Sequence, residues 1–245
     1  MRRFLQALPL ITVLLALGLF TACGSSNSQA RFVNTIQNTV NYGGGGLDVE
    51  FNGTKEFTNI QFPTAAASTY TSVPSGSITI LGLETGTTTQ VFSSSTSLSS
   101  STQYTLVATG FAGSSGVNAP GIVSFTDNNT EPTDGTVNFR VIDASLSGPV
   151  AVDVYILPAG TVLSGSPTIP DIGAESASSY VGVPYNSTGG GFVMYVTTAG
   201  STTPIFSQAL SVGSASVGSI RTLVLTDVAN GDFMNNSAIV LTDLN

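Results

Sequence analysis

The sequence predicts an all-β protein, with two tandem antiparallel β-sandwich domains that follow an N-terminal targeting segment. Three observations predict this organisation. A short apolar segment at the N-terminus ends at the only cysteine, Cys23. The rest of the chain alternates apolar and polar residues at period two, which is the signature of strands. Finally, a series of short landmarks occurs twice in the same order, which indicates an internal duplication.

The targeting segment has the three parts of a secretory signal peptide. Arg2 and Arg3 are basic, Leu5–Phe20 is mostly apolar, and the small residue Ala22 precedes Cys23. The apolar run is shorter and less pure than the roughly 20 residues of a spanning helix. Because Cys23 stands at the cleavage point, we expect its thiol to be acylated, and buried acyl chains contribute about 0.8 kcal/mol per methylene. The alternative is ordinary secretion with an incidental cysteine.

The segment Phe20-Thr21-Ala22-Cys23 resembles a bacterial lipobox, with Phe20 where Leu is usual. The resemblance implies a lipoprotein, and Gly24 after the cysteine implies sorting to the outer membrane. We therefore expect lipidation at Cys23 and a lipid-anchored protein of the bacterial cell envelope, on the periplasmic or the surface face of the outer membrane. The serines and glycine that follow predict a flexible tether.

Composition excludes several classes of partner. Charged residues make up 8% of the chain, against about 25% in typical soluble proteins. The hydrophobic fraction of 41% is high enough for a packed core. After the signal peptide only four basic residues remain, so the mature chain is acidic and is not expected to bind nucleic acid; these residues are Arg31, Lys55, Arg140 and Arg221.

The chain contains no histidine. Ser-His-Asp and Cys-His catalysis are therefore excluded, and zinc lacks its commonest ligand. We expect no enzyme activity, no cofactor and no catalytic residue.

The landmarks divide the mature chain into two halves of the size of single sandwich domains. In the first half they are Ala30–Asn34, Leu47–Phe51, Tyr70–Pro74, Tyr104–Val107 and Thr126-Asp127. In the second they are Phe139–Asp143, Val152–Ile156, Tyr180–Pro184, Arg221–Val224 and Thr242-Asp243.

The predicted boundaries follow from these landmarks and from a polar, proline-containing stretch between the halves. They are a signal peptide over 1–22, the lipidated cysteine and tether over 23–29, a first sandwich over 30–127, a linker over 128–136 and a second sandwich over 137–245.

Strand faces and turns are predicted within each half. Leu47, Val49 and Phe51 should face the core while Asp48, Glu50 and Asn52 face outward, and Phe192, Met194 and Val196 should share one face. Asn52-Gly53 predicts a tight hairpin, because both turn positions require positive φ. Loops are predicted at Gly43–Gly46, Ser93–Ser101, Gly113–Gly116 and Gly189–Gly191.

Three segments of the second half resemble the domain of unknown function 4397 family: Val150–Tyr155, Pro158–Thr161 and Ser179–Pro184. Leu223–Asp227 and Ile239–Asp243 extend the resemblance, and in the first half Leu47–Gly53 and Tyr70–Pro74 are similar to the same pattern. The resemblance is stronger in the second half, since the first departs from it at Asn41–Gly43 and in its serine-rich run. It implies Ig-like sandwiches, usually in tandem, on secreted or surface proteins, and it implies no activity and no site residues.

Candidate functional residues each have a structural alternative. Asp48 and Asp153 occupy matched strand positions and could be ligands or catalytic carboxylates, but we expect outward-facing residues or hydrogen bonds to a neighbouring turn. The oxygen-rich clusters Asp127, Asn128, Asn129, Glu131 and Asp134, and Asp227, Asn230, Gly231 and Asp232, could hold calcium. Turn formation is the expected role of both clusters, so no metal site is predicted.

Lys55 is the only lysine, so it is the only residue that could activate a serine in a Ser-Lys dyad. Five tyrosines could stack on sugars, although packing within the sandwich is the expected role; they are Tyr70, Tyr104, Tyr180, Tyr185 and Tyr195. The sequence thus predicts a non-enzymatic, lipid-anchored envelope protein, a structural or interaction module with an envelope protein or glycan as partner. The alternative is a glycan- or carbohydrate-binding surface module.

Overall fold

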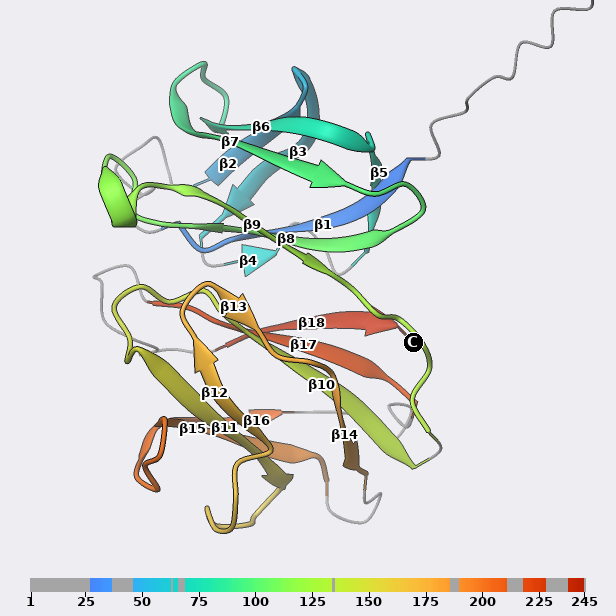
Figure 1. The fold of residues 1–245 in the computed structure, drawn as a ribbon, viewed down its shortest axis with the longest axis vertical. Helices are drawn as coiled ribbons and strands as arrows, with labels where there is room; N and C mark the ends of the chain where they lie inside the picture. The colour runs from blue at the N-terminus through green and yellow to red at the C-terminus, as the bar shows by residue number, and fades with distance from the viewer. Residues whose placement is uncertain are drawn as a thin grey trace, which may run out of the picture.

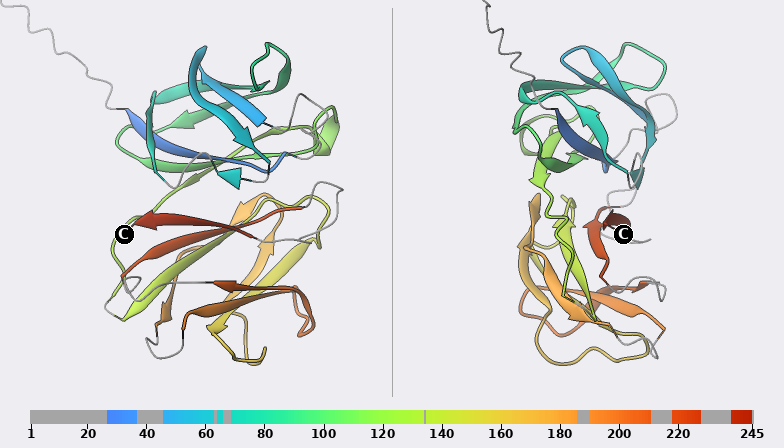
Figure 2. Two further views of the ribbon diagram at one scale, coloured as in Figure 1. Left: turned by 180° about the vertical axis from the view of Figure 1, so that it is seen from behind. Right: turned by 90° about the vertical axis from the view of Figure 1, so that its right-hand side faces the viewer.

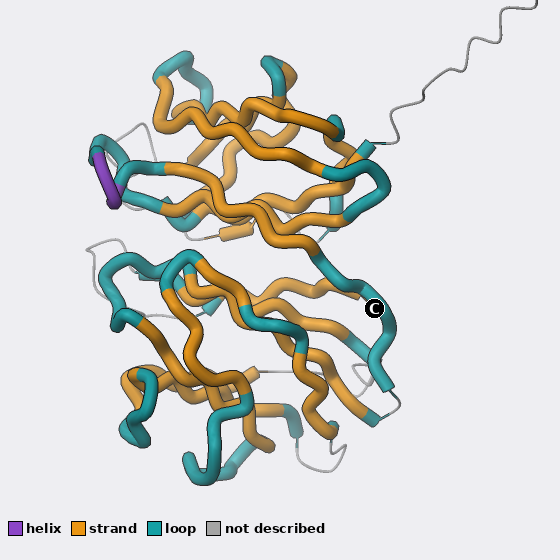
Figure 3. The backbone as a smooth tube through the Cα atoms, viewed as in Figure 1, coloured by secondary structure: helices purple, strands orange, loops and turns teal. Residues whose placement is uncertain are grey.

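The computed structural model describes residues 27–36, 46–62, 64–65, 69–133, 135–185, 190–210, 218–227 and 238–244. Within these ranges the chain forms strands and loops, with one short 3-10 turn at Gly116–Asn118 and no α-helix (Figure 3). The predicted all-β sandwich class is confirmed. The signal peptide, Cys23 and most of the tether lie outside the described residues. None of the described residues forms a helix that could cross a bilayer.

The first half contains two sheets. The inner sheet has the order β4-β1-β8-β9, and β5 also pairs with β1; its strands are β1 (Ser28–Asn34), β4 (Thr64–Ala65), β5 (Thr71–Val73), β8 (Gln103–Thr109) and β9 (Gly121–Thr126). The outer sheet has the order β3-β2-β6-β7; its strands are β2 (Gly46–Phe51), β3 (Thr54–Gln61), β6 (Gly76–Glu84) and β7 (Gln90–Leu98).

The second half has the same strand order. Its inner sheet runs β13-β10-β17-β18, and β14 also pairs with β10; the strands are β10 (Thr136–Asp143), β13 (Ser176–Ala177), β14 (Val181–Pro184), β17 (Ile220–Leu225) and β18 (Ile239–Leu244). Its outer sheet runs β12-β11-β15-β16; the strands are β11 (Ala151–Pro158), β12 (Ile169–Gly173), β15 (Phe192–Thr198) and β16 (Pro204–Leu210).

The four sheets are stacked in four layers, with the two inner sheets facing one another across the middle of the molecule (Figures 1 and 2). The pairing is antiparallel except for one pair in each half. β1 runs parallel to β8, and β10 runs parallel to β17. The predicted linker, 128–136, contains the irregular connection from β9 and the first residue of β10.

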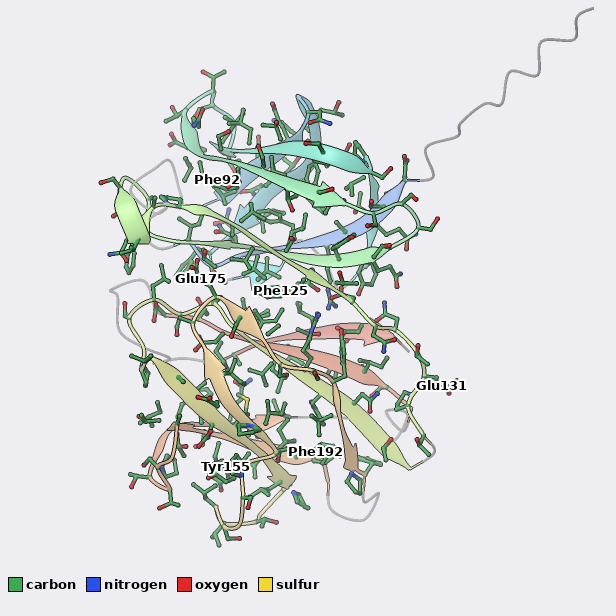
Figure 4. All side chains as sticks on the ribbon, in the orientation of Figure 1. Phe92, Phe125, Glu131, Tyr155, Glu175 and Phe192 are labelled. Atoms are coloured by element: carbon green, nitrogen blue, oxygen red, sulfur yellow. The ribbon has the colours of Figure 1, made fainter. Side chains whose placement is uncertain are left out.

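Each half buries its own core between its two sheets. Leu47, Val49 and Phe51 face the core of the first half, as predicted. Phe192, Met194 and Val196 share the core face in the second half, as predicted. Figure 4 marks Phe92 and Phe192 in these two cores.

A third apolar cluster lies between the two inner sheets. It joins Val33 and Val107 of the first half to Ile142, Val224 and Leu241 of the second. Since β1, β8, β10 and β17 pack on both faces, neighbouring residues such as Phe32 and Val33 are both fully buried. In a sheet with one solvated face only alternate residues would be buried.

Two predicted turns have different outcomes. Asn52 and Gly53 have φ values of 49° and 83° and connect β2 to β3, as the hairpin prediction requires. The loop predicted over Ser93–Ser101 is wrong for Ser93–Leu98, which belongs to β7, and correct for Ser99–Ser101, which forms the turn after it. The hydroxyls of Ser94 and Thr96 hydrogen-bond to β9, at Ile122 and Ser124. Polar residues are stable in β7 because one of its faces is solvated and its backbone pairs with β6.

Candidate functional site

A cluster of four buried, charged side chains lies between the two inner sheets. Arg31 on β1 and Arg140 on β10 point away from their own sandwich cores, and both are almost fully buried, at 0% and 2% exposure. In each half the arginine is the direct strand neighbour of a threonine, Thr105 or Thr222. Asp127 follows β9 and Asp243 lies on β18, so each half supplies one arginine, one threonine and one aspartate.

Each arginine forms an ion pair with the aspartate of the other half. Arg31 Nη2 lies 2.7 Å from Asp243 Oδ1, and Arg140 Nη2 lies 2.5 Å from Asp127 Oδ1. A longer contact of 3.6 Å joins Arg31 Nη2 to Asp127 Oδ2. Each guanidinium also donates to a backbone carbonyl, from Arg31 Nη1 to Thr242 O and from Arg140 Nη1 to Thr126 O. The four charges thus form two reciprocal links between the halves.

The two threonines sit at the centre of this network. Thr105 Oγ1 accepts from Arg31 Nε at 2.9 Å and from Arg140 Nη2 at 3.1 Å, and it donates to Asp127. Thr222 Oγ1 accepts from Arg140 Nε at 3.2 Å and from Arg31 Nη2 at 3.3 Å, and it donates to Asp243. The matching pattern gives the network an approximate two-fold symmetry.

A tyrosine covers each arginine from the edge of the interface. The guanidinium carbon of Arg31 lies 5.2 Å from the centre of the Tyr70 ring, and that of Arg140 lies 4.8 Å from the centre of the Tyr180 ring. The phenol of Tyr70 donates to Asp127 Oδ2 at 2.6 Å, and that of Tyr180 donates to Asp243 Oδ2 at 3.0 Å. Such cation–π contacts are stronger when the cation is desolvated.

The electrostatics keep Arg31 and the two tyrosines in their usual charge states. Burial alone would lower the pKa of Arg31, but Asp243 and Asp127 outweigh it and raise that pKa. Burial raises the pKa of Tyr70 and of Tyr180, with a further contribution in each case from the nearby carboxylates. The phenols of Tyr70 and Tyr180 therefore remain hydrogen-bond donors at neutral pH, and Arg31 remains a cation.

This arrangement holds the two halves together. A catalytic acid or base needs access to a substrate. The carboxylates of Asp127 and Asp243 are instead buried and paired with arginines. The geometry therefore indicates a structural role, in which the network links the two halves.

The predicted oxygen-rich cluster around Asp127 is organised by hydrogen bonds within the protein. Asn129 donates to Tyr70 and to Gln103, and Asn128 accepts from the backbone N–H of Thr130. Glu131 is exposed. Asp134 lies outside the described residues. Across the described ranges, no group of three or more acidic or cysteine side chains could hold a metal ion.

In the second predicted cluster only Asp227 is described. Its Oδ2 accepts the backbone N–H groups of Leu146 and Ser147, which is a turn-stabilising role. Asn230, Gly231 and Asp232 lie outside the described residues.

Asp48 and Asp153 hold neighbouring turns in the same way in the two halves. Asp48 accepts from the backbone N–H groups of Asn59 and Gly86, and Asp153 from those of Asp171 and Gly200. Of the roles expected for these residues, hydrogen bonding to a neighbouring turn is correct. Both side chains point away from the core, as the outward-facing prediction requires. They are not exposed to solvent, however, because turns cover them and leave Asp48 2% and Asp153 6% exposed.

The remaining candidates also have partners within the fold. Lys55 Nζ lies 2.6 Å from Asp48 Oδ2, so its ammonium forms an ion pair. Tyr104 accepts the backbone N–H of Ser99, Tyr195 donates to the carbonyl of Thr161, and Tyr185 packs against the second core. Tyr104 and Tyr185 thus match the expected packing within the sandwich. Tyr70 and Tyr180 instead lie at the interface between the halves, and Tyr195 lies on the face of β15 opposite the core.

Two open pockets flank the network, each of about 510 Å³. One is lined by Asn27, Gln29, Ser101, Thr102, Gln103 and Asp127, and is strongly polar. The other includes Thr126, Arg140 and Tyr180 and is partly apolar. Both lie against residues that the network already uses.

The sequence reasoning did not identify the network, although its members were visible as landmarks. Arg31 and Arg140 lie in otherwise apolar strands at matched positions, and Thr126-Asp127 and Thr242-Asp243 are matched as well. A charge in an apolar strand that recurs in a second copy indicates a buried, paired charge. The missing information was that each charge pairs with the other copy.

The family model described as "Domain of unknown function (DUF4397)" matches residues 28–155, just over half of the chain. The matched segment covers the first sandwich and continues through β10 into β11. No curated protein matches the chain.

Proposed function

Because the chain belongs to the domain of unknown function 4397 family, whose description assigns no activity, we propose its function from its own residues. The protein is a non-enzymatic, lipid-anchored module of the bacterial cell envelope with a structural or interaction role. Its mature part is a rigid pair of sandwiches tethered to the outer membrane through Cys23.

One observation carries the non-enzymatic role: the ionisable side chains with matched positions in the two halves are engaged in holding the fold. The arginines and carboxylates of the interface pair with one another, and Asp48 and Asp153 hold turns. No histidine is present to move protons. The exposed loops and sheet edges are then the surfaces that remain for contacts with partners.

The anchor would place one end of the molecule close to the bilayer. Asn27 is the first described residue and follows Cys23 by four positions. Four extended residues span at most about 14 Å. The end of the first sandwich that carries Asn27, with its polar pocket, would therefore lie near the lipid headgroups.

Lipid attachment is tested by changing the acylated residue. Full-length protein expressed in a diderm bacterium should incorporate an alkyne-labelled fatty acid and sediment with outer membranes. Cys23→Ala should lose the label and leave the membrane fraction. Ser25→Ala, a change in the same tether, should retain both properties. A labelled or membrane-bound Cys23→Ala protein would rule out this anchor.

The interaction role is tested with the lipid-free chain that starts at Gly24. Used as bait in envelope extract, with and without calcium, it should retain a reproducible partner that is lost when exposed loops are replaced. Absence of any partner would favour a passive structural role, and measurable turnover of a substrate would contradict the non-enzymatic proposal.

Glycan binding is the second candidate, and the polar pocket beside Asn27 favours it. Amide side chains such as those of Gln29 and Gln103 are suitable donors and acceptors for sugar hydroxyls. Saturable binding on a glycan array, weakened by Gln29→Ala, would support this candidate. Binding that Gln29→Ala leaves unchanged would exclude this pocket as the glycan site.

A further inference from the structure

One buried carboxylate in the second half stands where the first half has an amide. Asn34 ends β1 as Asp143 ends β10, each three residues after the interface arginine of its strand. The Oδ1 atom of each side chain stabilises the same kind of turn. It accepts the backbone N–H of Ile36 in the first half and of Ser145 in the second. The two positions are therefore structurally equivalent.

The second polar atom of each side chain differs. In the first half, Nδ2 of Asn34 donates to the backbone carbonyl of Ile60 at 2.9 Å. The residue of the second half that is equivalent to Ile60 is Ile172. Ile60 pairs with Leu47 in the outer sheet of the first half, and Ile172 pairs with Val152 at the corresponding place in the second half. Oδ2 of Asp143 has no hydrogen-bond partner among the described residues, although Asp143 is 0% exposed. An ionised carboxylate has no proton to donate to a carbonyl.

A second carboxylate lies near Asp143 and increases the cost of its ionisation. Asp227 follows β17, and its charge acts on Asp143. Among the described residues, no arginine or lysine forms an ion pair with Asp143. Glu175 precedes the strand partner of Asp143, Ser176, but its carboxylate accepts the hydroxyl of Thr109 in the other half.

We propose that Asp143 is a proton-binding site. At mildly acidic pH its carboxyl is protonated and Oδ2 supplies the donor that Asn34 supplies in the first half. At neutral pH the group is ionised inside the protein, which destabilises this end of the second sandwich. The fold thereby contains a pH-sensitive element, and this property does not depend on the proposed membrane anchor.

The electrostatics agree with this geometry. Burial is the main cause that raises the pKa of Asp143 to about 6; the charge of Asp227 adds to it, and the hydrogen bonds from Ser145 oppose it. In the unfolded chain an aspartate has a pKa of about 3.9. Between these two pH values the folded protein binds a proton that the unfolded chain has lost. The contribution of Asp143 to stability is therefore full below about pH 4 and decreases as the pH rises to about 6.

The test compares pH profiles of unfolding for the mature chain, residues 23–245 with Cys23→Ser, which contains every described strand. A difference of about two pKa units corresponds to a roughly 100-fold increase in the unfolding equilibrium constant between pH 4 and pH 7. Asp143→Asn should remove this increase and make the protein more stable at pH 7. Asp171→Asn, which changes an exposed carboxylate, should leave the profile unchanged.

A reciprocal variant and a direct measurement complete the test. Asn34→Asp should add a second decrease in stability over the same pH range. The carboxyl carbon of Asp143, followed by NMR, should titrate near pH 6. Titration of that carbon below pH 4.5, or an Asp143→Asn profile equal to that of the parent, would overturn the proposal. Stabilisation by calcium that Asp143→Asn abolishes would also overturn it, because the site would then hold a cation in place of the proton.

Discussion

At the scale of single residues, Asp48 allows the contribution of an ion pair to stability to be compared with that of backbone hydrogen bonds. Lys55 approaches its carboxylate at 2.6 Å, but the lysine side chain is 44% exposed. The same carboxylate accepts two backbone N–H groups, from Asn59 and Gly86. Partly exposed ion pairs contribute about 0–1 kcal/mol, whereas a hydrogen bond to a charged group contributes about 1.5–3 kcal/mol.

We therefore expect Asp48→Ala to lower the free energy of unfolding by about 2–4 kcal/mol and Lys55→Met by less than about 1 kcal/mol. Burial would raise the pKa of Asp48, but the hydrogen bonds from Lys55, Asn59 and Gly86 outweigh it and lower that pKa. The contribution is thus present above the ordinary aspartate pKa and lost as the pH falls below it. Urea denaturation at pH 7 and pH 3 measures both effects. Equal losses for the two variants would assign the role to the ion pair.

The role of Asp48 could be predicted from the sequence only in outline. Its match with Asp153 and its place between apolar residues indicate a side chain that points away from the core. Its acceptor role depends on Gly86, which is 38 residues away along the chain. Contacts at such separations follow from strand order, which the period-two pattern does not contain.

At the scale of elements, the packing of β6 beside β7 depends on a glycine that lies opposite an aromatic residue. Gly82 is paired with Phe92, and both are buried. A methyl group at residue 82 would fall on the ring of Phe92, which belongs to the first core (Figure 4). The small residue therefore determines how the ring packs across the outer sheet.

Gly82→Ala should destabilise the protein by about 1–3 kcal/mol, the usual cost of overpacking a core. The double variant Gly82→Ala/Phe92→Leu should recover part of this loss, because the smaller side chain leaves room for the methyl group. Gly121→Ala is the control, since its nearest neighbour would be Ser94 Oγ at 3.6 Å, an ordinary contact. Thermal unfolding measures all three variants. If Phe92→Leu gave no recovery, the ring would not be the obstacle.

Strand faces and tight turns could be predicted at this scale, but strand neighbours could not. The Asn52-Gly53 hairpin follows from local chemistry, because both residues tolerate positive φ. The parallel pairing of β1 with β8 joins segments more than 70 residues apart, and nothing local determines it. The Ser93–Leu98 part of β7 could not be predicted as a strand, because the serines on its solvated face obscure the apolar alternation that Phe92 and Leu98 belong to.

At the scale of the whole molecule, the two halves share a buried surface with a polar part and an apolar part. The arginine network forms the polar part, and Val33, Val107, Ile142, Val224 and Leu241 pack beside it. Thr109 of the first half also donates to Glu175 of the second, and Figure 4 marks Glu175 and Phe125 at this boundary. Pairs of consecutive apolar residues, such as Leu106-Val107 and Leu223-Val224, were the available signal that these strands are buried on both faces.

This interface should make the halves unfold as one unit. Arg31 and Asp243 belong to different halves and are both fully buried at the side chain. Removing one member of such a pair leaves an uncompensated charge, which costs about 3–5 kcal/mol, whereas removing both does not. Arg31→Met and Asp243→Asn should therefore each lower the free energy of unfolding by more than half of the loss in the double variant. The coupling energy between the two changes should be about 1–3 kcal/mol.

Calorimetry of the mature chain with Cys23→Ser tests this cooperativity. The parent should show one unfolding transition, and the single variants should show two, because the weakened interface no longer couples the halves. The pair Asp48→Asn/Lys55→Met, which lies away from the interface, should lower the transition temperature without splitting the transition. Additive costs for Arg31→Met and Asp243→Asn, or a single transition in every variant, would mean that the apolar cluster between the inner sheets alone joins the halves. The arginines would then serve to fix their orientation.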